Sequence, residues 1–89
     1  MTWGNRMNNY RRRIQFENGY AANIICTEHS YGGEQGLFEI AIMVDGKICY
    51  ENPLGEGVIG YLDFQQVNET LEKIRLLPKC SKFDPGSAE

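Results

Sequence analysis

Two glycine turns, each set between runs of β-branched and aromatic residues, constrain the fold of this chain more than any other feature. The turns are "ENG" at residues 17–19 and "VDG" at residues 44–46, and such runs on either side of a short glycine loop are typical of β-hairpins. In the first hairpin, a three-residue loop with a left-handed glycine places Ile14 opposite Ala22, which leaves one face of the pair mainly apolar. A slip of one residue would mix polar and apolar side chains on both faces.

The second turn gives a matching result when the same loop type is assumed. Val44, Asp45 and Gly46 then form the loop, and Ile42 faces Ile48. The two hairpins together predict four strands, at residues 10–17, 20–28, 37–43 and 47–51.

A capped amphipathic helix is predicted after the second hairpin, over residues 63–77. Asp63 is a good N-cap, Gln66 stands where a capping box needs it, and Pro78 ends the helix. A chain of 89 residues suits one domain, which we place at residues 10–78, between a flexible arm (1–9) and a flexible tail (79–89). The expected fold is α+β: a four-stranded antiparallel sheet of two hairpins with one C-terminal helix packed on one face.

One helix covers only one face of such a sheet. The core beneath the helix is expected to contain Ile14, Phe16, Ile24, Phe38, Ile40, Ile42 and Ile48, with Val67, Leu71 and Ile74 from the helix itself. The opposite face is expected to carry Ile25, Leu37, Ala41, Met43 and Cys49. An exposed face this apolar favours a second copy of the chain or a partner, so we expect a homo-oligomer.

Charge is divided unevenly along the chain, whose net charge is −3. Four arginines and no acidic residue lie in the first thirteen residues, whereas residues 14–72 carry ten acidic side chains and a single base, Lys47. An acidic body of this kind favours a basic surface on a partner.

The segment "EHSYGGEQG", residues 28–36, is interpreted first as a connection between the second and third strands, whose glycines serve a turn. As a polar loop with Tyr31 near its tip, it is also the candidate for contact with a partner or ligand. The candidate partner- or ligand-binding residues are His29, Tyr31, Gly32, Gly33, Gln35, Arg11 and Arg13. A second glycine segment, "GEGVIG" at residues 55–60, matches the G-x-G-x-x-G pattern of dinucleotide loops, but no second parallel strand follows it.

Nothing in the residue pattern indicates catalysis, a metal or a cofactor, so we expect none of the three. Cys26 and His29 form a C-x-x-H pair, but Cys49 and Cys80 stand alone, unlike the paired ligands of structural zinc sites. Three cysteines at irregular spacing favour free thiols in a reducing compartment. No apolar run reaches the roughly 18 residues of a membrane span, and no secretory signal is visible, so we expect a cytoplasmic protein without a membrane partner.

Three stretches, "FENGYAANII" (16–25), "YGGEQGLFEIAIM" (31–43) and "GVIGYLDFQQVNETLEKIRLLP" (57–78), resemble small uncharacterised proteins encoded by tailed bacteriophages and prophages. The resemblance covers residues 8–78. It implies a protein made in the infected bacterial cytoplasm, where such accessory proteins bind and inhibit host factors.

Three functions are therefore carried forward. The first is a non-enzymatic phage accessory protein that inhibits a host protein, such as a component of a defence system. The second is an oligomeric sponge for a nucleotide signal, in which the segments 28–36 and 55–60 supply backbone amides and the arginines neutralise phosphate. The third, nucleic-acid binding through the basic N-terminal segment, is disfavoured by the acidic body.

Overall fold

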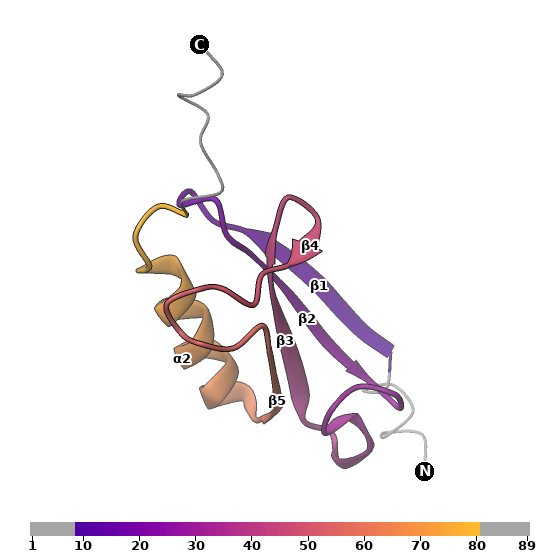
Figure 1. The fold of residues 1–89 in the computed structure, drawn as a ribbon. Helices are drawn as coiled ribbons and strands as arrows, with labels where there is room; N and C mark the ends of the chain where they lie inside the picture. Colours follow the sequence, from indigo (N-terminus) through magenta and orange to yellow (C-terminus); the bar gives the residue numbers. More distant parts are fainter. Residues whose placement is uncertain (1–8, 81–89) are drawn as a thin grey trace.

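The computed structural model describes residues 9–80 and shows an antiparallel sheet with one helix against one of its faces (Figure 1). The α+β class, the antiparallel sheet and the single long helix were all predicted. The elements in chain order are β1 (Asn9–Gln15), β2 (Ala21–Thr27), the 3-10 turn η1 (Gly33–Gln35), β3 (Phe38–Val44), β4 (Lys47–Ile48), β5 (Val58–Leu62) and α2 (Phe64–Arg75).

The first hairpin has the predicted register. Arg12 pairs with Ile24 and Ile14 pairs with Ala22. Phe16 donates its N–H to Tyr20 O at 2.8 Å, and the loop between them turns through Gly19 at φ +96°. Because the register holds, the apolar set of this hairpin faces the core.

The second hairpin differs from the prediction by one residue. Met43 pairs with Ile48, not Ile42, because the loop has only two residues, Asp45 and Gly46. Both have positive φ, +58° and +80°, as a type I′ turn requires, and the twist of that turn matches the twist of the strands it joins. Ile48 is consequently 38% exposed on the face away from the helix, and the adjacent Cys49 is buried in the core instead.

β4 and β5 lie along the same edge of β3. Ile42 accepts a hydrogen bond from the N–H of Cys49 and donates its own N–H to Gly57 O, both at 2.8 Å. On either side of this position, Met43 pairs with Ile48 in β4 and Ala41 pairs with Val58 in β5. β4 and β5 therefore form one strand position, interrupted by residues 49–57, which we call the excursion.

The strand at residues 58–62 was predicted as loop, and it is instead the longer part of the fourth strand position. It contains a bulge, because Phe38 pairs with Leu62 while Ile40 pairs with Ile59, so that two residues of β5 oppose one of β3. Tyr61 lies in this bulge with φ +60°. The bulge delivers the chain to Asp63, where the helix begins.

The helix is capped at both ends. At its start, Asp63 Oδ1 accepts the N–H of Gln66 at 2.8 Å, and Gln66 Oε1 accepts the N–H of Asp63 at 2.9 Å, which is the predicted capping box. The helix ends at Arg75, two residues before the predicted end. There Asn18, from the first hairpin loop, donates its side-chain amide to Ile74 O at 2.8 Å and Leu77 O at 3.1 Å.

The main core lies between the sheet and α2. Ile40, Ile42 and Ile74 are fully buried there, whereas Ile14, Phe16 and Leu71 are only partly buried at its margin. Asn9 lies in β1 and Cys80 is buried, so the folded domain includes one residue assigned to the arm and one assigned to the tail. Lys79, also assigned to the tail, is described and exposed, and the rest of the predicted flexible segments, residues 1–8 and 81–89, lies outside the described residues. No helix of residues 9–80 is long and apolar enough to cross a membrane.

Candidate interaction surfaces

The loop at residues 28–36 joins β2 to β3 and folds back onto the end of the sheet. A Cβ on Gly33 would lie 1.7 Å from Thr27 O, and Gly32 has φ +90° and lies against the backbone of Tyr61. Both glycines are therefore required by the close approach of backbone to backbone. The geometry matches the interpretation of this loop as a connection.

The backbone amides of this loop are already used within the protein. Tyr31 donates its N–H to Glu39 Oε1 at 2.8 Å, Gly33 donates to Ser30 O, and Leu37 donates to Gly32 O. Their N–H groups are thus turned toward protein acceptors, and this part of the loop presents no free cradle of amides for a phosphate group.

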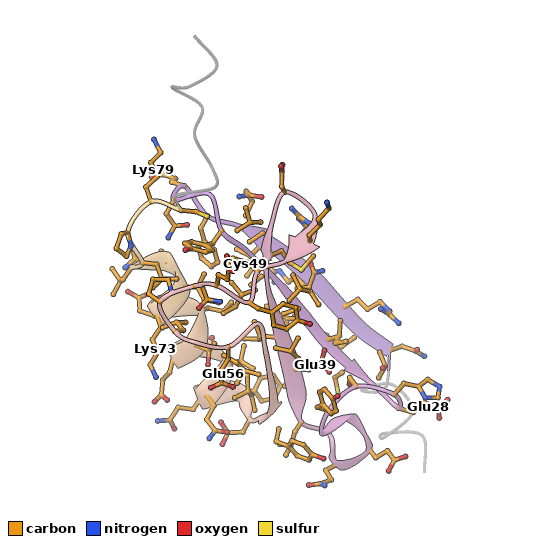
Figure 2. The ribbon with its side chains drawn as sticks, in the orientation of Figure 1. Glu28, Glu39, Cys49, Glu56, Lys73 and Lys79 are labelled. Atoms are coloured by element: carbon orange, nitrogen blue, oxygen red, sulfur yellow. The ribbon has the colours of Figure 1, made fainter. Side chains whose placement is uncertain are left out.

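The side chains of His29, Tyr31 and Gln35 remain exposed around this loop. His29 Nε2 lies 3.7 Å from Glu28 Oε2, and the histidine side chain is 89% exposed. Figure 2 shows Glu28 at the loop end of the molecule, well separated from Cys49. No nucleophile is positioned beside the imidazole by these contacts, and within residues 9–80 no three potential metal ligands gather into a site.

Gly57 and Gly60 lie in close contact with tyrosine side chains, which leave no room for a Cβ atom at either position. A Cβ on Gly57 would lie 2.6 Å from Cδ1 of Tyr50, and a Cβ on Gly60 would lie 2.4 Å from Cβ of Tyr31. The segment 55–60 thus runs into β5, and its last glycine contacts Tyr31 and not a helix interior. Sequence reasoning missed this role, although the run "VIGYL" carries the β-branched and aromatic residues of a strand.

The sheet face turned away from α2, which we call the outer face, is built from three cross-strand rows. One row is Arg11, Ile25 and Glu39; the next is Arg13, Asn23, Ala41 and Val58; the third is Gln15, Ala21, Met43 and Ile48. Tyr31 and Tyr50, 62% and 66% exposed, flank these rows. No element within the described part of the chain covers this face (Figure 1).

The apolar content of the outer face is smaller than the sequence indicated. Ala41 and Met43 are only 9% and 8% exposed because they pack with Ala21 and Val58, and Cys49 lies in the main core. The exposed apolar surface comes instead from Ile48 and the tyrosine rings. Self-association of this face stays a prediction.

The arginines of β1 are divided between the two faces of the sheet. Arg11 and Arg13 border an open depression of about 300 Å³ on the outer face, which is also lined by Asn23, Ile25 and the intervening Arg12. Arg12, between them in sequence, pairs with the core residue Ile24. Within residues 9–80 none of the three guanidinium groups forms an ion pair, and Arg13 donates only to Gln15 Oε1, at 3.3 Å.

A second concavity lies on the helix side of β1, and we call it the inner groove. The helix lies over β2, β3 and β5, so the inner side of β1 is left partly open. The groove holds a cavity of about 150 Å³. Its principal lining residues are Tyr10, Arg12 and Ile14 from β1, Phe38 from β3, and Phe64 and Leu71 from α2.

Aromatic rings form one end of the inner groove. Phe38 packs edge-on against Tyr10, with ring centroids 5.3 Å apart, and against Phe64 at 5.1 Å. Phe64 is nonetheless 70% exposed and Tyr10 is 38% exposed, so apolar ring surface faces solvent beside an unpaired guanidinium. Sequence reasoning did not identify this groove.

A hydrogen bond between the exposed side chains of Glu72 and Arg75 on α2 lowers the pKa of Glu72 and raises the pKa of Arg75. The other two groups with shifted pKa values, Tyr20 and Cys26, are buried and unsuited to chemistry. Burial, together with a hydrogen bond and electrostatic repulsion from Cys80 and repulsion from Cys49, raises the pKa of Tyr20 to about 12. Burial also raises the pKa of the Cys26 thiol. Both groups stay neutral at physiological pH, and all three cysteines are free and buried.

No family model, curated protein or solved structure matches this chain.

Proposed function

We propose that this chain is a non-enzymatic binding protein that inhibits a partner protein by covering it with the outer face. The observation that carries the proposal is the composition of that face. It presents two exposed tyrosines and two arginines around a small apolar centre, and tyrosine and arginine are enriched among the residues that dominate protein interfaces.

The free charges on this face favour an acidic partner surface. Arg11 and Arg13 have no acidic partner within the described residues, whereas Glu39 is already bonded to the Tyr31 amide. Guanidinium groups of this kind form strong bidentate contacts with carboxylates. The proposal therefore replaces the basic partner surface expected from overall charge with an acidic one opposite β1.

A host protein of the infected bacterium is the partner we propose, on the strength of the resemblance to phage proteins. Neither alternative function gains support from the geometry. Five of the seven amides of residues 31–37 that a nucleotide sponge would use are already bonded: Gly33, Gln35, Gly36 and Leu37 within the loop, and Tyr31 to Glu39 in β3. Arg12 faces away from Arg11 and Arg13, so the three arginines form no continuous track for a phosphate backbone.

The test is affinity capture from a bacterial lysate with three forms of the protein. The outer-face variant combines Arg13→Glu with Tyr50→Ser, and the control combines Lys73→Glu with Gln65→Ser on the exposed surface of α2. Circular dichroism establishes that all three are folded. We expect the outer-face variant to lose a captured protein by roughly tenfold or more while the control retains it. Equal capture by all three forms would contradict the proposed surface.

A further inference from the structure

We infer that the inner groove and the free edge of β1 together form a binding site for an extended acidic peptide segment of a partner, which adds to the sheet as a strand beside β1. This site is separate from the tyrosines and the apolar centre of the outer face. Strand addition of this kind draws its affinity from main-chain hydrogen bonds and its specificity from pockets for alternate side chains.

The backbone of β1 offers the hydrogen bonds that strand addition needs. Phe16 bonds to Tyr20, and in an antiparallel ladder the bonded pairs alternate, so Tyr10, Arg12 and Ile14 also direct their backbone groups toward β2. The N–H and C=O groups of the residues between them point away from the sheet. Within the described residues the sheet has two edges, β1 and the position shared by β4 and β5; β1 is the longer uninterrupted strand, with seven residues, six of them exposed.

The inner groove supplies a place for alternate side chains of an added strand. Such a strand would lie beside β1, and its side chains on the helix side would enter the space between β1 and α2. Phe64 and Tyr10 present exposed ring surface there, and Leu71 is partly buried at the same groove. Apolar side chains of the added strand would bury this ring surface.

The side chains of β1 define the sequence that fits opposite them. Directly opposed residues of neighbouring strands contact each other, and opposite charges attract across the pair. β1 reads Tyr10, Arg11, Arg12, Arg13 and Ile14. The complementary segment therefore has three consecutive acidic residues between two apolar ones. The first and third acidic side chains lie beside Arg11 and Arg13, and the middle one lies beside Arg12.

A second copy of this chain does not fit the site. Antiparallel pairing of two β1 strands around Arg12 would set arginine against arginine at every central position, and like charges directly opposed are destabilising. The arginines that exclude a second copy are the same groups that select an acidic strand.

The test uses a fluorescent synthetic peptide with Val-Glu-Glu-Glu-Val at its centre and blocked ends, titrated with the full chain. Two further peptides carry backbone N-methyl groups within this central segment: one on its first, third and fifth residues, the other on its second and fourth. A fourth peptide has lysine in place of each glutamate. We expect the parent peptide to bind and the lysine peptide to fail. One N-methylated peptide should lose roughly tenfold or more in affinity, and the other should bind as the parent does.

Variants of the chain locate the peptide. Arg12→Ser and Phe64→Ser should each weaken binding, whereas Lys47→Ser, which removes a positive charge from β4, and Tyr50→Ser, on the outer face, should not. No binding of the parent peptide, or equal loss from both N-methylated peptides, would overturn strand addition at β1. The proposed function would survive that outcome, because its test depends on Tyr50 and Arg13 and not on Arg12 or Phe64.

Discussion

At the scale of single residues, two asparagines hold together segments that are distant in sequence or irregular in backbone. Asn18 closes the C-terminal end of α2 from the opposite end of the chain and also accepts the N–H of Tyr20 at 3.0 Å. Asn52, 7% exposed, organises the excursion by donating to Cys49 O and Glu56 O and accepting from the N–H of Leu54. Each amide satisfies donors and acceptors that regular structure leaves unpaired.

Replacing Asn18 with alanine is expected to lower the free energy of unfolding by about 1–3 kcal/mol, because carbonyls of the last helical turn lose a donor. Asn18→Asp should be no better, since it removes the donor and places a negative charge at the negative end of the helix. Urea denaturation followed by circular dichroism measures both. Asn68→Ala, on the exposed side of α2, is the matched control and should change stability by less than about 0.5 kcal/mol. Equal stability of Asn18→Ala and the control would refute this role.

At the scale of elements, the excursion is an insertion into an otherwise continuous strand. In a continuous strand, one residue would make both backbone hydrogen bonds to Ile42. Here Cys49 donates to Ile42 O and Gly57 O accepts from Ile42 N–H, so the two bonds are divided between two residues. The pairs of Met43 with Ile48 and Ala41 with Val58 are in register on either side. If Cys49 were followed directly by Val58, the ladder along β3 would be unbroken.

Deletion of residues 50–57 is therefore expected to preserve the fold. Loss of the half-buried Leu54 side chain costs free energy, and removal of an eight-residue loop recovers closure entropy, so the free energy of unfolding should change by no more than about 2 kcal/mol. Cooperative urea unfolding and an unchanged β-sheet spectrum are the expected measurements. A control deletion of the same length, residues 58–65, removes β5 and the start of α2 and should abolish cooperative unfolding. Loss of cooperativity in both deletions would show that the excursion is part of the fold.

The elements also show where sequence reasoning succeeds and where it stops. The first hairpin was predictable because a polar and an apolar side alternate along it, and the helix because Asp63 and Gln66 mark its start. The register predicted for the second hairpin was wrong because Ile42 and Met43 are both apolar, so hydrophobicity did not distinguish the two possible registers. β5 was missed because the excursion separates it from β4, and only the pairing with Ile42 reveals that the two are one strand position.

The candidate site was predictable only in part. Tyr31, Arg11 and Arg13 were named from sequence, and the fold sets all three on or beside the outer face. Gly32 and Gly33 proved to serve the backbone approach to Thr27 and Tyr61. Tyr50 was not identified as a site residue, because its exposure depends on the way its ring packs over Gly57.

At the scale of the whole molecule, the two faces of the sheet and its free edge determine what the protein can associate with. α2 covers one face, the outer face is uncovered within residues 9–80, and β1 ends the sheet on one side (Figure 1). An exposed edge strand seven residues long would ordinarily pair with its own copy in another molecule. The three consecutive arginines are the feature of β1 that opposes this pairing.

Replacing Arg11, Arg12 and Arg13 together with threonine should therefore cause the chain to associate through β1, because threonine favours strands and carries no charge to repel the second copy. Replacing the same three residues with lysine keeps the charge and should leave the association state as it is in the unmodified chain. Sedimentation velocity over a range of concentrations measures the mass of each form against the 10.2 kDa of a single chain. Arg11 and Arg13 also lie on the outer face, so the threonine variant is measured again with Tyr50→Ser added. Pairing of β1 edges would persist in that form, whereas an outer-face dimer would be weakened. If the threonine variant sediments like the lysine variant, charge is not what protects this edge, and the selection of acidic strands by the same arginines would lose its physical basis.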